Sequence, residues 1–199
     1  MRAGPFLSAV AAGLCVEEKT VRVFAREMRL AGLLSTGARG INAPNMTAED
    51  LAKLVVALLA TDRPSKAVEV MNHFGVMQLL EHAGPAPILG LPPKASHTFL
   101  ELMEFWCDPT VSIPLGFRIE TIGTSSVRLA KEGLETSGVV DTTVFYSSGV
   151  EASTLDGSVV SDPLVARGLI VSRSISSADL AEIKESIFGR WVEDPIEEK

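Results

Sequence analysis

The chain has few of the residues on which metal and redox sites depend. Its 199 residues include two cysteines and three histidines. Cys15 and Cys107 lie in different segments and match no metal or redox spacing, so we expect two reduced, partly buried thiols. His73, His82 and His97 match no zinc pattern and are expected at the surface or at helix ends. The sequence therefore predicts no metal cofactor.

Motifs of the common hydrolases and nucleotide-binding enzymes are also absent. There is no glycine-rich phosphate loop with a lysine, no H-E-x-x-H and no G-x-S-x-G. Ser147-Ser148-Gly149 follows a predicted strand, but a turn explains it without nucleophilic chemistry. Glu101 and Glu104 are expected on a solvated helix surface. We therefore expect a protein that is not an enzyme and uses no cofactor.

Long apolar runs are missing as well. No stretch of 18 uncharged apolar residues occurs. The apolar stretch at 4–16 lacks both a basic region beyond Arg2 and a clean cleavage site. These absences argue against a membrane span and a secretion signal, so the expected location is the cytoplasm.

Charge is distributed unevenly along the chain. Residues 1–66 contain nine Lys/Arg and six Asp/Glu, a net +3, whereas residues 67–199 contain nine and nineteen, a net −10. Phosphate contacts depend on local basic density rather than on the overall net charge of −7. The first third can therefore bind nucleic acid while the acidic remainder points away, which favours a protein of two parts.

The first 40 residues predict two helices joined by a tight turn. A short helix is expected over 6–12, with Gly13 at its C-terminal turn. A second helix begins at 16 or 17 and runs to about residue 31, where Gly32 caps it in the left-handed conformation. The side chains expected to face the core are Val21, Phe24, Ala25, Met28, Leu33 and Leu34.

Three arginines mark the second helix. Arg22, Arg26 and Arg29 are spaced i, i+4 and i+7, which places them along one face. Glu17 and Glu18 lie in the first turn, where the positive helix terminus favours carboxylates. An ordinary solvated helix surface is the alternative interpretation of this basic face.

Two more helices and a linker follow. Thr47 caps a predicted amphipathic helix ending near residue 60. Another helix is expected over 65–82, with Pro64 at its start and Gly75 weakening or dividing it. Residues 83–95 contain four prolines and two glycines, which is typical of a domain linker.

The remaining residues predict a small α+β domain. A helix over 96–108 is expected to bury Phe99, Leu102, Met103 and Trp106. β-branched, alternating segments predict strands, and Ser177 is expected to cap a final helix. The predicted strands are 115–122, 126–130, 139–146 and 169–174, followed by the helix 177–188 and a solvated acidic tail at 194–199. The expected fold class is α+β, with a helical domain at 1–82, the linker at 83–95 and an α+β domain at 96–199.

Residues 6–40 resemble the winged helix-turn-helix domains of bacterial and bacteriophage DNA-binding proteins. The resemblance lies in a small helix, the Gly13 turn, a second helix entered by Thr20-Val21-Arg22, and an Ala31-Gly32-Leu33 exit into a Gly/Arg loop at 35–40. It covers under a third of the chain. It implies that the second helix enters the major groove and that a short wing occupies the loop.

The resemblance also implies which side chains meet DNA. Lys19, Thr20, Arg22, Val23 and Arg26 would face the groove. Arg39 would lie near a phosphate or the minor groove, and Arg29 shares the arginine face. Glu17 and Glu18 depart from the family pattern; they would either accept from a cytosine amino group or reduce non-specific binding.

The expected function is therefore non-catalytic binding of double-stranded DNA, with transcriptional regulation as its role. A homo-oligomer, preferably a dimer, is expected because one recognition helix buries too little surface to be specific alone. A phage or mobile-element packaging or replication adaptor, similar to a small terminase subunit, is one alternative. A protein-binding inhibitor that uses the same surface is another. The C-terminal domain could bind a protein partner or a small effector.

Overall fold

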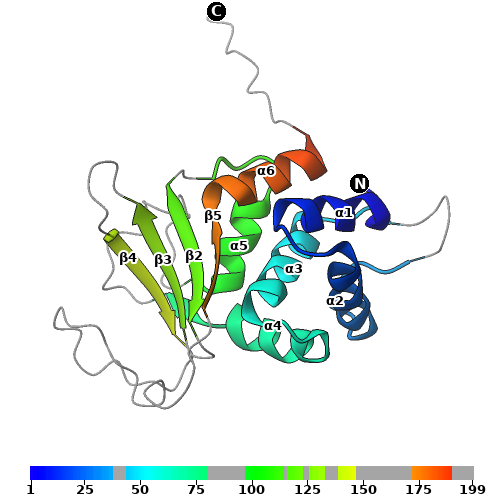
Figure 1. Ribbon diagram of the computed structural model, residues 1–199, viewed down its shortest axis with the longest axis horizontal. Helices are drawn as coiled ribbons and strands as arrows, with labels where there is room; N and C mark the ends of the chain where they lie inside the picture. The colour runs from blue at the N-terminus through cyan, green and yellow to red at the C-terminus, as the bar shows by residue number, and fades with distance from the viewer. Residues whose placement is uncertain are drawn as a thin grey trace, which may run out of the picture.

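The computed structural model describes seven stretches of the chain, at 1–37, 44–79, 97–113, 116–122, 126–132, 139–146 and 172–189. These stretches combine helices with one antiparallel sheet, which confirms the α+β class. Figure 1 shows the sheet on one side of the molecule and α1 and α2 on the other, with α3 and α5 between them. The helices are α1 (Ala3–Gly13), α2 (Glu18–Leu30), α3 (Ala48–Ala60), the short 3-10 helix η2 (Pro64–Lys66), α4 (Ala67–Gly75), α5 (Phe99–Cys107) and α6 (Ser177–Phe188).

The sheet has the strand order β1-β4-β3-β2-β5, and all neighbouring strands are antiparallel. Consecutive strands β2, β3 and β4 form a meander, β1 pairs with β4, and β5 pairs with β2 before the chain enters α6. Buried Ile119 of β2 pairs with Leu129 of β3 and with Ile175 of β5, so the apolar face is continuous across three strands. The strands are β1 (Gln78–Leu79), β2 (Phe117–Ile122), β3 (Ser126–Glu132), β4 (Val139–Tyr146) and β5 (Ser172–Ser176).

One hydrophobic core joins the described elements. It contains Phe6 of α1, Leu54 of α3, Trp106 of α5 and Ile183 of α6, all essentially inaccessible to solvent. The expected linker at 83–95 lies outside the described residues. The helices that follow it pack on those that precede it: α5 contacts α3, and α6 contacts α1. The predicted N-terminal and C-terminal parts therefore share a core instead of having one each.

Most predicted elements are present with small shifts at their ends. α3, with Thr47 as its N-cap, and the bounds of α6 are confirmed. The four side chains expected to be buried in α5 are buried, although that helix begins at Phe99 after the N-cap Thr98. The cap of α6 is Ser176 rather than Ser177, because the Ser176 side chain accepts from the backbone N–H of Asp179. Part of the predicted fourth strand, at 169–171, lies outside the described residues.

The helix expected over 65–82 is shorter than predicted. It ends at Gly75, and β1 follows within three residues. Glycine disfavours helix continuation, and pairing of Gln78 with Tyr146 of β4 supplies backbone partners that a longer helix would lose. Gly75 therefore ends α4 instead of weakening its middle.

Gly13 lies at the C-terminal turn of α1, as predicted, but its backbone is not left-handed. Gly13 is the last residue of α1, and the left-handed backbone of the turn belongs to Cys15, with φ of 52°. A Cβ at Gly13 would lie 2.1 Å from Cγ1 of Ile183 on α6. Glycine at this position is therefore required by the close approach of α1 and α6. The prediction for Gly32 is confirmed, since its φ is +73° and it ends α2.

Candidate nucleic-acid interface

The helix α2 separates its apolar and basic side chains cleanly. Val21, Phe24, Ala25 and Met28 are completely buried, as the sequence predicted. Because these side chains repeat with the helical period of 3.6 residues, the opposite side of the helix faces solvent. The exposed side chains on that side include Lys19, Arg22 and Arg26. The structure thus brings three of the predicted contact residues onto one accessible surface, called here the α2 face.

Two of the three predicted arginines form ion pairs within α2. Arg22 Nη2 lies 2.5 Å from the Glu18 carboxylate, and Arg26 Nη2 lies 2.9 Å from that of Glu27. The hydrogen bond from Arg22, followed by one from Ser8, lowers the pKa of Glu18. Lys19 makes no ion pair with another described residue.

The remaining predicted residues of α2 are less accessible. Thr20, Val23 and Arg29 are each half-buried. Arg29 Nη2 lies 3.9 Å from Sδ of Met46, so this guanidinium is directed toward the segment that precedes α3. Arg29 therefore belongs to the border of the α2 face rather than to its centre.

Sequence reasoning missed Leu30. Its side chain is 78% exposed, the most exposed of the large hydrophobic side chains among the described residues. Leu30 follows Arg22 and Arg26 at intervals of four residues, so it continues their row along α2. The same helical spacing that revealed the arginines could have revealed it.

The winged part of the prediction is not confirmed. Arg39 lies outside the described residues, as does most of the loop expected to form the wing. Ser35–Gly37 and the residues from 44 to α3 contain no strand; the pairing recorded there is one isolated bridge between Arg2 and Asn45. The described residues therefore supply a two-helix unit without a β-ribbon.

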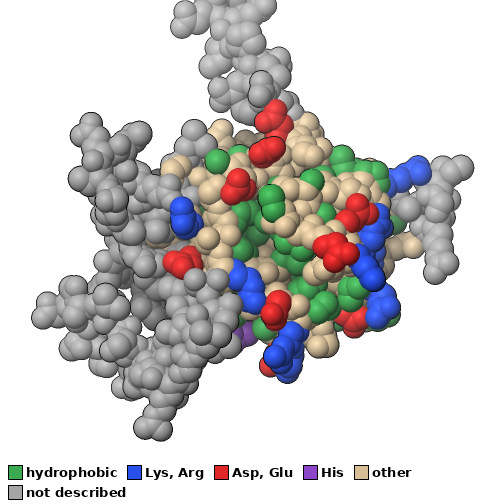
Figure 2. All heavy atoms as spheres, viewed as in Figure 1, with side chains coloured by type: hydrophobic (Ala, Val, Ile, Leu, Met, Phe, Trp, Pro, Cys, Tyr) green, Lys and Arg blue, Asp and Glu red, His purple; other side chains and the backbone are tan. Residues whose placement is uncertain are grey.

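Charges on this side of the molecule are mixed. Residues 17–30 contain four Lys/Arg and three Asp/Glu, a net +1. Figure 2 shows Lys and Arg side chains along the side formed by α2, with Asp and Glu side chains among them. Attraction of a polyanion must therefore come from the local placement of a few cations, since no broad positive field covers α2.

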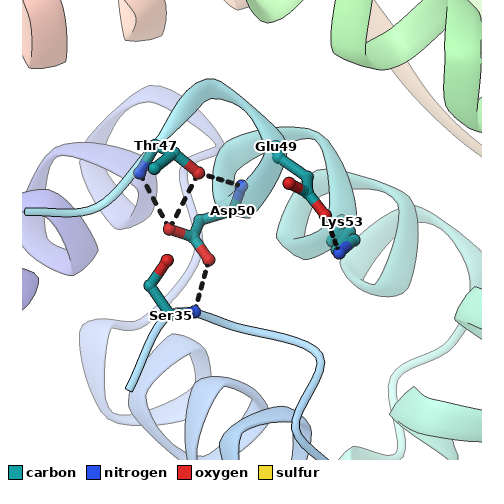
Figure 3. Close-up of polar contacts among 5 residues, drawn as sticks. All are labelled: Ser35, Thr47, Glu49, Asp50 and Lys53. Atoms are coloured by element: carbon teal, nitrogen blue, oxygen red, sulfur yellow. Dashed lines mark hydrogen bonds and ion pairs between the residues drawn. The ribbon is translucent and has the colours of Figure 1, made fainter. Parts of the chain in front are cut away.

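A buried carboxylate links the exit of α2 to α3. Asp50 is 2% exposed, and Figure 3 shows its two oxygens turned toward different segments. One oxygen, Oδ2, accepts from the backbone N–H of Thr47 at 2.8 Å and from its hydroxyl at 3.0 Å. The other, Oδ1, accepts from the backbone N–H of Ser35 at 2.7 Å. This Asp50 clamp, made by Ser35, Thr47 and Asp50, fixes the chain just beyond α2.

Several titratable groups away from α2 have shifted pKa values or lie exposed. Burial raises the pKa of the fully enclosed Cys107 thiol, whereas Cys15 is exposed. Burial lowers the pKa of Lys184, whose ammonium donates to the carbonyls of Asp108 and Val111. Glu104 is not simply solvated as predicted, since burial and the nearby Glu49 raise its pKa.

The histidines do not form a site among the described residues. His73 is exposed and lies edge-on to Phe74, whereas His97 is buried, with Nδ1 3.9 Å from the Glu101 carboxylate. His82 lies outside the described residues. Within the described part of the chain, no three His, Cys, Asp or Glu side chains are grouped as metal ligands, and no helix is both long and apolar enough to cross a membrane.

Comparison of the chain with known protein families, with curated proteins and with solved structures finds no match to any of them.

Proposed function

We propose that this protein binds double-stranded DNA through α2, without catalysis, as a transcriptional regulator. The observation that carries the proposal is the α2 face: Lys19, Arg22 and Arg26 are exposed on one side of a helix whose other side is buried. A helix held in this way can enter the major groove, where arginine and lysine recognise guanine.

The carboxylates on α2 do not prevent this role. The side chains of Arg22 and Glu18 are 49% and 45% exposed, and those of Arg26 and Glu27 are 71% and 30% exposed. Exposed ion pairs of this kind contribute little to stability, because water screens them. A phosphate or a guanine edge can therefore replace the carboxylate as the partner of each guanidinium. The carboxylates reduce non-specific attraction, which leaves base contacts as a larger share of the binding.

An oligomer is part of the proposal. A single helix contacts few base pairs, and regulators of this kind usually bind two half-sites through a two-fold dimer. A dimer fits a regulator, whereas a ring of subunits would favour the packaging-adaptor alternative. The mass of the particle with and without DNA separates these two roles.

Protein binding by the same surface is the second candidate, and the exposure of Leu30 favours it. Protein interfaces centre on apolar and arginine side chains that lose water together. Leu30 lies in the same row as Arg22 and Arg26, which supplies both kinds of group. Replacing Leu30 with Ala would then weaken the protein complex while leaving affinity for random DNA unchanged.

The decisive experiment replaces Arg22 and Arg26 with Ala and measures binding to a labelled random-sequence duplex across a series of salt concentrations. The slope of log K against log salt is negative, and each lost phosphate contact should reduce its magnitude by about 0.9. We expect the double variant to bind several-fold more weakly at low salt and to show a smaller slope.

Arg118→Ala is the matched control. Arg118 is exposed on β2, in the sheet, while α2 lies across the helical layer (Figure 1). It removes one positive charge, as each of the two α2 substitutions does, but away from α2, so DNA affinity should stay near that of the parent protein. If the parent does not bind DNA in low salt, or if Arg22→Ala/Arg26→Ala binds as well as the control, α2 is not a DNA-binding helix.

A further inference from the structure

The Asp50 clamp goes beyond what a helix cap requires. A capping box needs one carboxylate oxygen at the third position of the helix, which accepts from the N-cap residue. In Asp50 the oxygen that accepts from the N-cap residue Thr47 is Oδ2. Its second oxygen, Oδ1, is bound by the Ser35 N–H, fifteen residues earlier in the chain. This second contact joins α3 to the segment that leaves α2.

Another capping box in the molecule provides a comparison. In α6, Ser176 and Asp179 make the same reciprocal bonds, and the Asp179 carboxylate accepts from both the backbone N–H and the hydroxyl of Ser176. Asp179 is exposed, and its recorded hydrogen bonds stay inside the box. Asp50, in contrast, is buried and reaches a distant segment. Asp179 therefore only caps its own helix, whereas Asp50 also makes a tertiary contact.

The chain between α2 and Ser35 is short and constrained. Gly32 ends the helix in the left-handed conformation, and the Leu33 N–H donates to the Met28 carbonyl at 2.9 Å. Leu34 follows and is 3% exposed. With so few residues between them, the position of Ser35 restricts where the last turn of α2 can lie. Fixing Ser35 therefore fixes one end of the helix.

A second contact acts at the same end. Arg29, in the last turn of α2, lies 3.9 Å from Sδ of Met46, which is buried and adjacent to Thr47. The last turn of α2 thus rests on the segment that leads into the Asp50 clamp. The two contacts come from different groups and restrain the same junction.

We infer that Asp50 is a positioning residue that sets the angle at which α2 presents its basic face to DNA. The inference rests on the proposed function. Asp50 lies behind α2, buried, so it contacts no DNA itself. Its carboxylate holds Ser35 against the first turn of α3. Because this contact fixes the direction of α2, it also fixes the direction in which the guanidinium groups of Arg22 and Arg26 point.

The test is Asp50→Asn, with Asp179→Asn as its matched control. Asparagine keeps the size of the side chain but replaces one acceptor oxygen with an NH₂ group, so it cannot accept from both Ser35 and Thr47. The control makes the same change in the box of α6, where the carboxylate holds no distant segment. Binding to the random-sequence duplex is measured well below the unfolding temperature of each variant, after circular dichroism shows intact helices.

A purely electrostatic effect and a positioning role change the DNA affinity of Asp50→Asn in opposite directions. Removing a negative charge near DNA should tighten binding if electrostatics alone acts. A positioning role instead predicts that Asp50→Asn weakens binding several-fold and reduces the steepness of its salt dependence, because misdirected guanidinium groups lose phosphate contacts. Asp179→Asn should leave both unchanged. Hydrogen exchange should show faster exchange at the Ser35 amide in Asp50→Asn only.

The possible outcomes distinguish failure of the positioning role from failure of the proposed function. If the parent protein binds DNA and Asp50→Asn binds equally or more tightly, Asp50 only stabilises the fold and the inference fails alone. If the parent binds no DNA, the proposed function fails and the positioning role fails with it. Should Asp50→Asn not fold, Ser35→Pro serves instead, because it removes the donor N–H and leaves the Thr47–Asp50 box intact; unchanged DNA binding in that variant overturns the inference.

Discussion

Gly13 shows how the absence of a side chain at one residue can allow two helices to pack together. In sequence terms it marks a turn, but in the structure its missing Cβ makes room for Ile183. The left-handed position of that turn is filled by Cys15, with φ of 52°. A glycine that is needed for close approach and one that is needed for a turn look alike in a sequence. Only the partner element, 170 residues away in the chain, distinguishes them.

Gly13→Ala should destabilise the protein. The new Cβ would lie 2.1 Å from Cγ1 and 2.8 Å from Cδ1 of Ile183, which is itself 1% exposed and has little room to move. Overpacking costs about 1–3 kcal/mol, and it outweighs the helix-propensity gain of up to about 1 kcal/mol. Thermal or urea unfolding measures the difference.

Gly4→Ala is the control in the same helix. A Cβ at Gly4 would meet no atom within 4 Å, so only the propensity term acts and stability should stay the same or rise slightly. Ile183→Ala removes both clashing atoms, so adding it to Gly13→Ala should cost less than the sum of the two single losses, since the two positions are in contact. A Gly13→Ala protein as stable as its parent would show that α1 and α6 can separate at no cost.

At the scale of elements, the sequence predicted α2, α3, α5 and α6 well because each has a local signal. α3 has the Thr47 cap and a clear apolar period, and α6 has the Ser176–Asp179 box. β1 was missed because it has two residues and forms only through pairing with β4. The strand order β1-β4-β3-β2-β5 is likewise a non-local property. Of the candidate site, the exposed arginines and the Glu18–Arg22 pair follow from helical spacing. The pair between the adjacent residues Arg26 and Glu27 and the Asp50 clamp were not predictable in this way.

Glu27→Gln on α2 should strengthen DNA binding. The substitution frees Arg26 from a contact of 2.9 Å and removes one negative charge from the α2 face. Both changes favour phosphate contacts, so affinity at low salt should rise by a few-fold. Titration of the random-sequence duplex at two salt concentrations provides the measurement.

Glu182→Gln on α6 removes the same charge from another exposed helix position and should have little effect. Glu27→Gln binding that matches this control would mean that the Glu27 carboxylate does not compete with DNA. Weaker binding in Glu27→Gln would assign the carboxylate a direct favourable contact, such as acceptance from a cytosine amino group.

For the whole molecule, the shared core makes Cys107 a reporter of global unfolding. Cys107 is completely buried in α5, and burial raises the pKa of its thiol, so both access and thiolate formation are suppressed in the folded state. In a Cys15→Ser variant, thiol labelling should proceed only as fast as the core opens. Labelling of Cys107 across a urea series should follow the loss of helical circular dichroism in a single transition.

Two separate transitions in that experiment would mean that α5 belongs to a unit that unfolds independently of α1–α4. The thiol of Cys15 in the parent protein is the opposite control, because it is exposed and should react without denaturant. Labelling of both thiols at equal rates in the folded state would contradict the burial of Cys107.

The contact between α1 and α6 has a consequence for how the chain acquires its structure during synthesis. α1 is made before α6, and the helix that covers Gly13 is completed only when residues 177–188 have been translated. Until then, part of the apolar surface of α1 has no permanent neighbour. Such long-range closure slows folding and exposes apolar surface to other chains in the meantime. The newly made protein should therefore depend on chaperones most strongly in the interval before α6 leaves the ribosome.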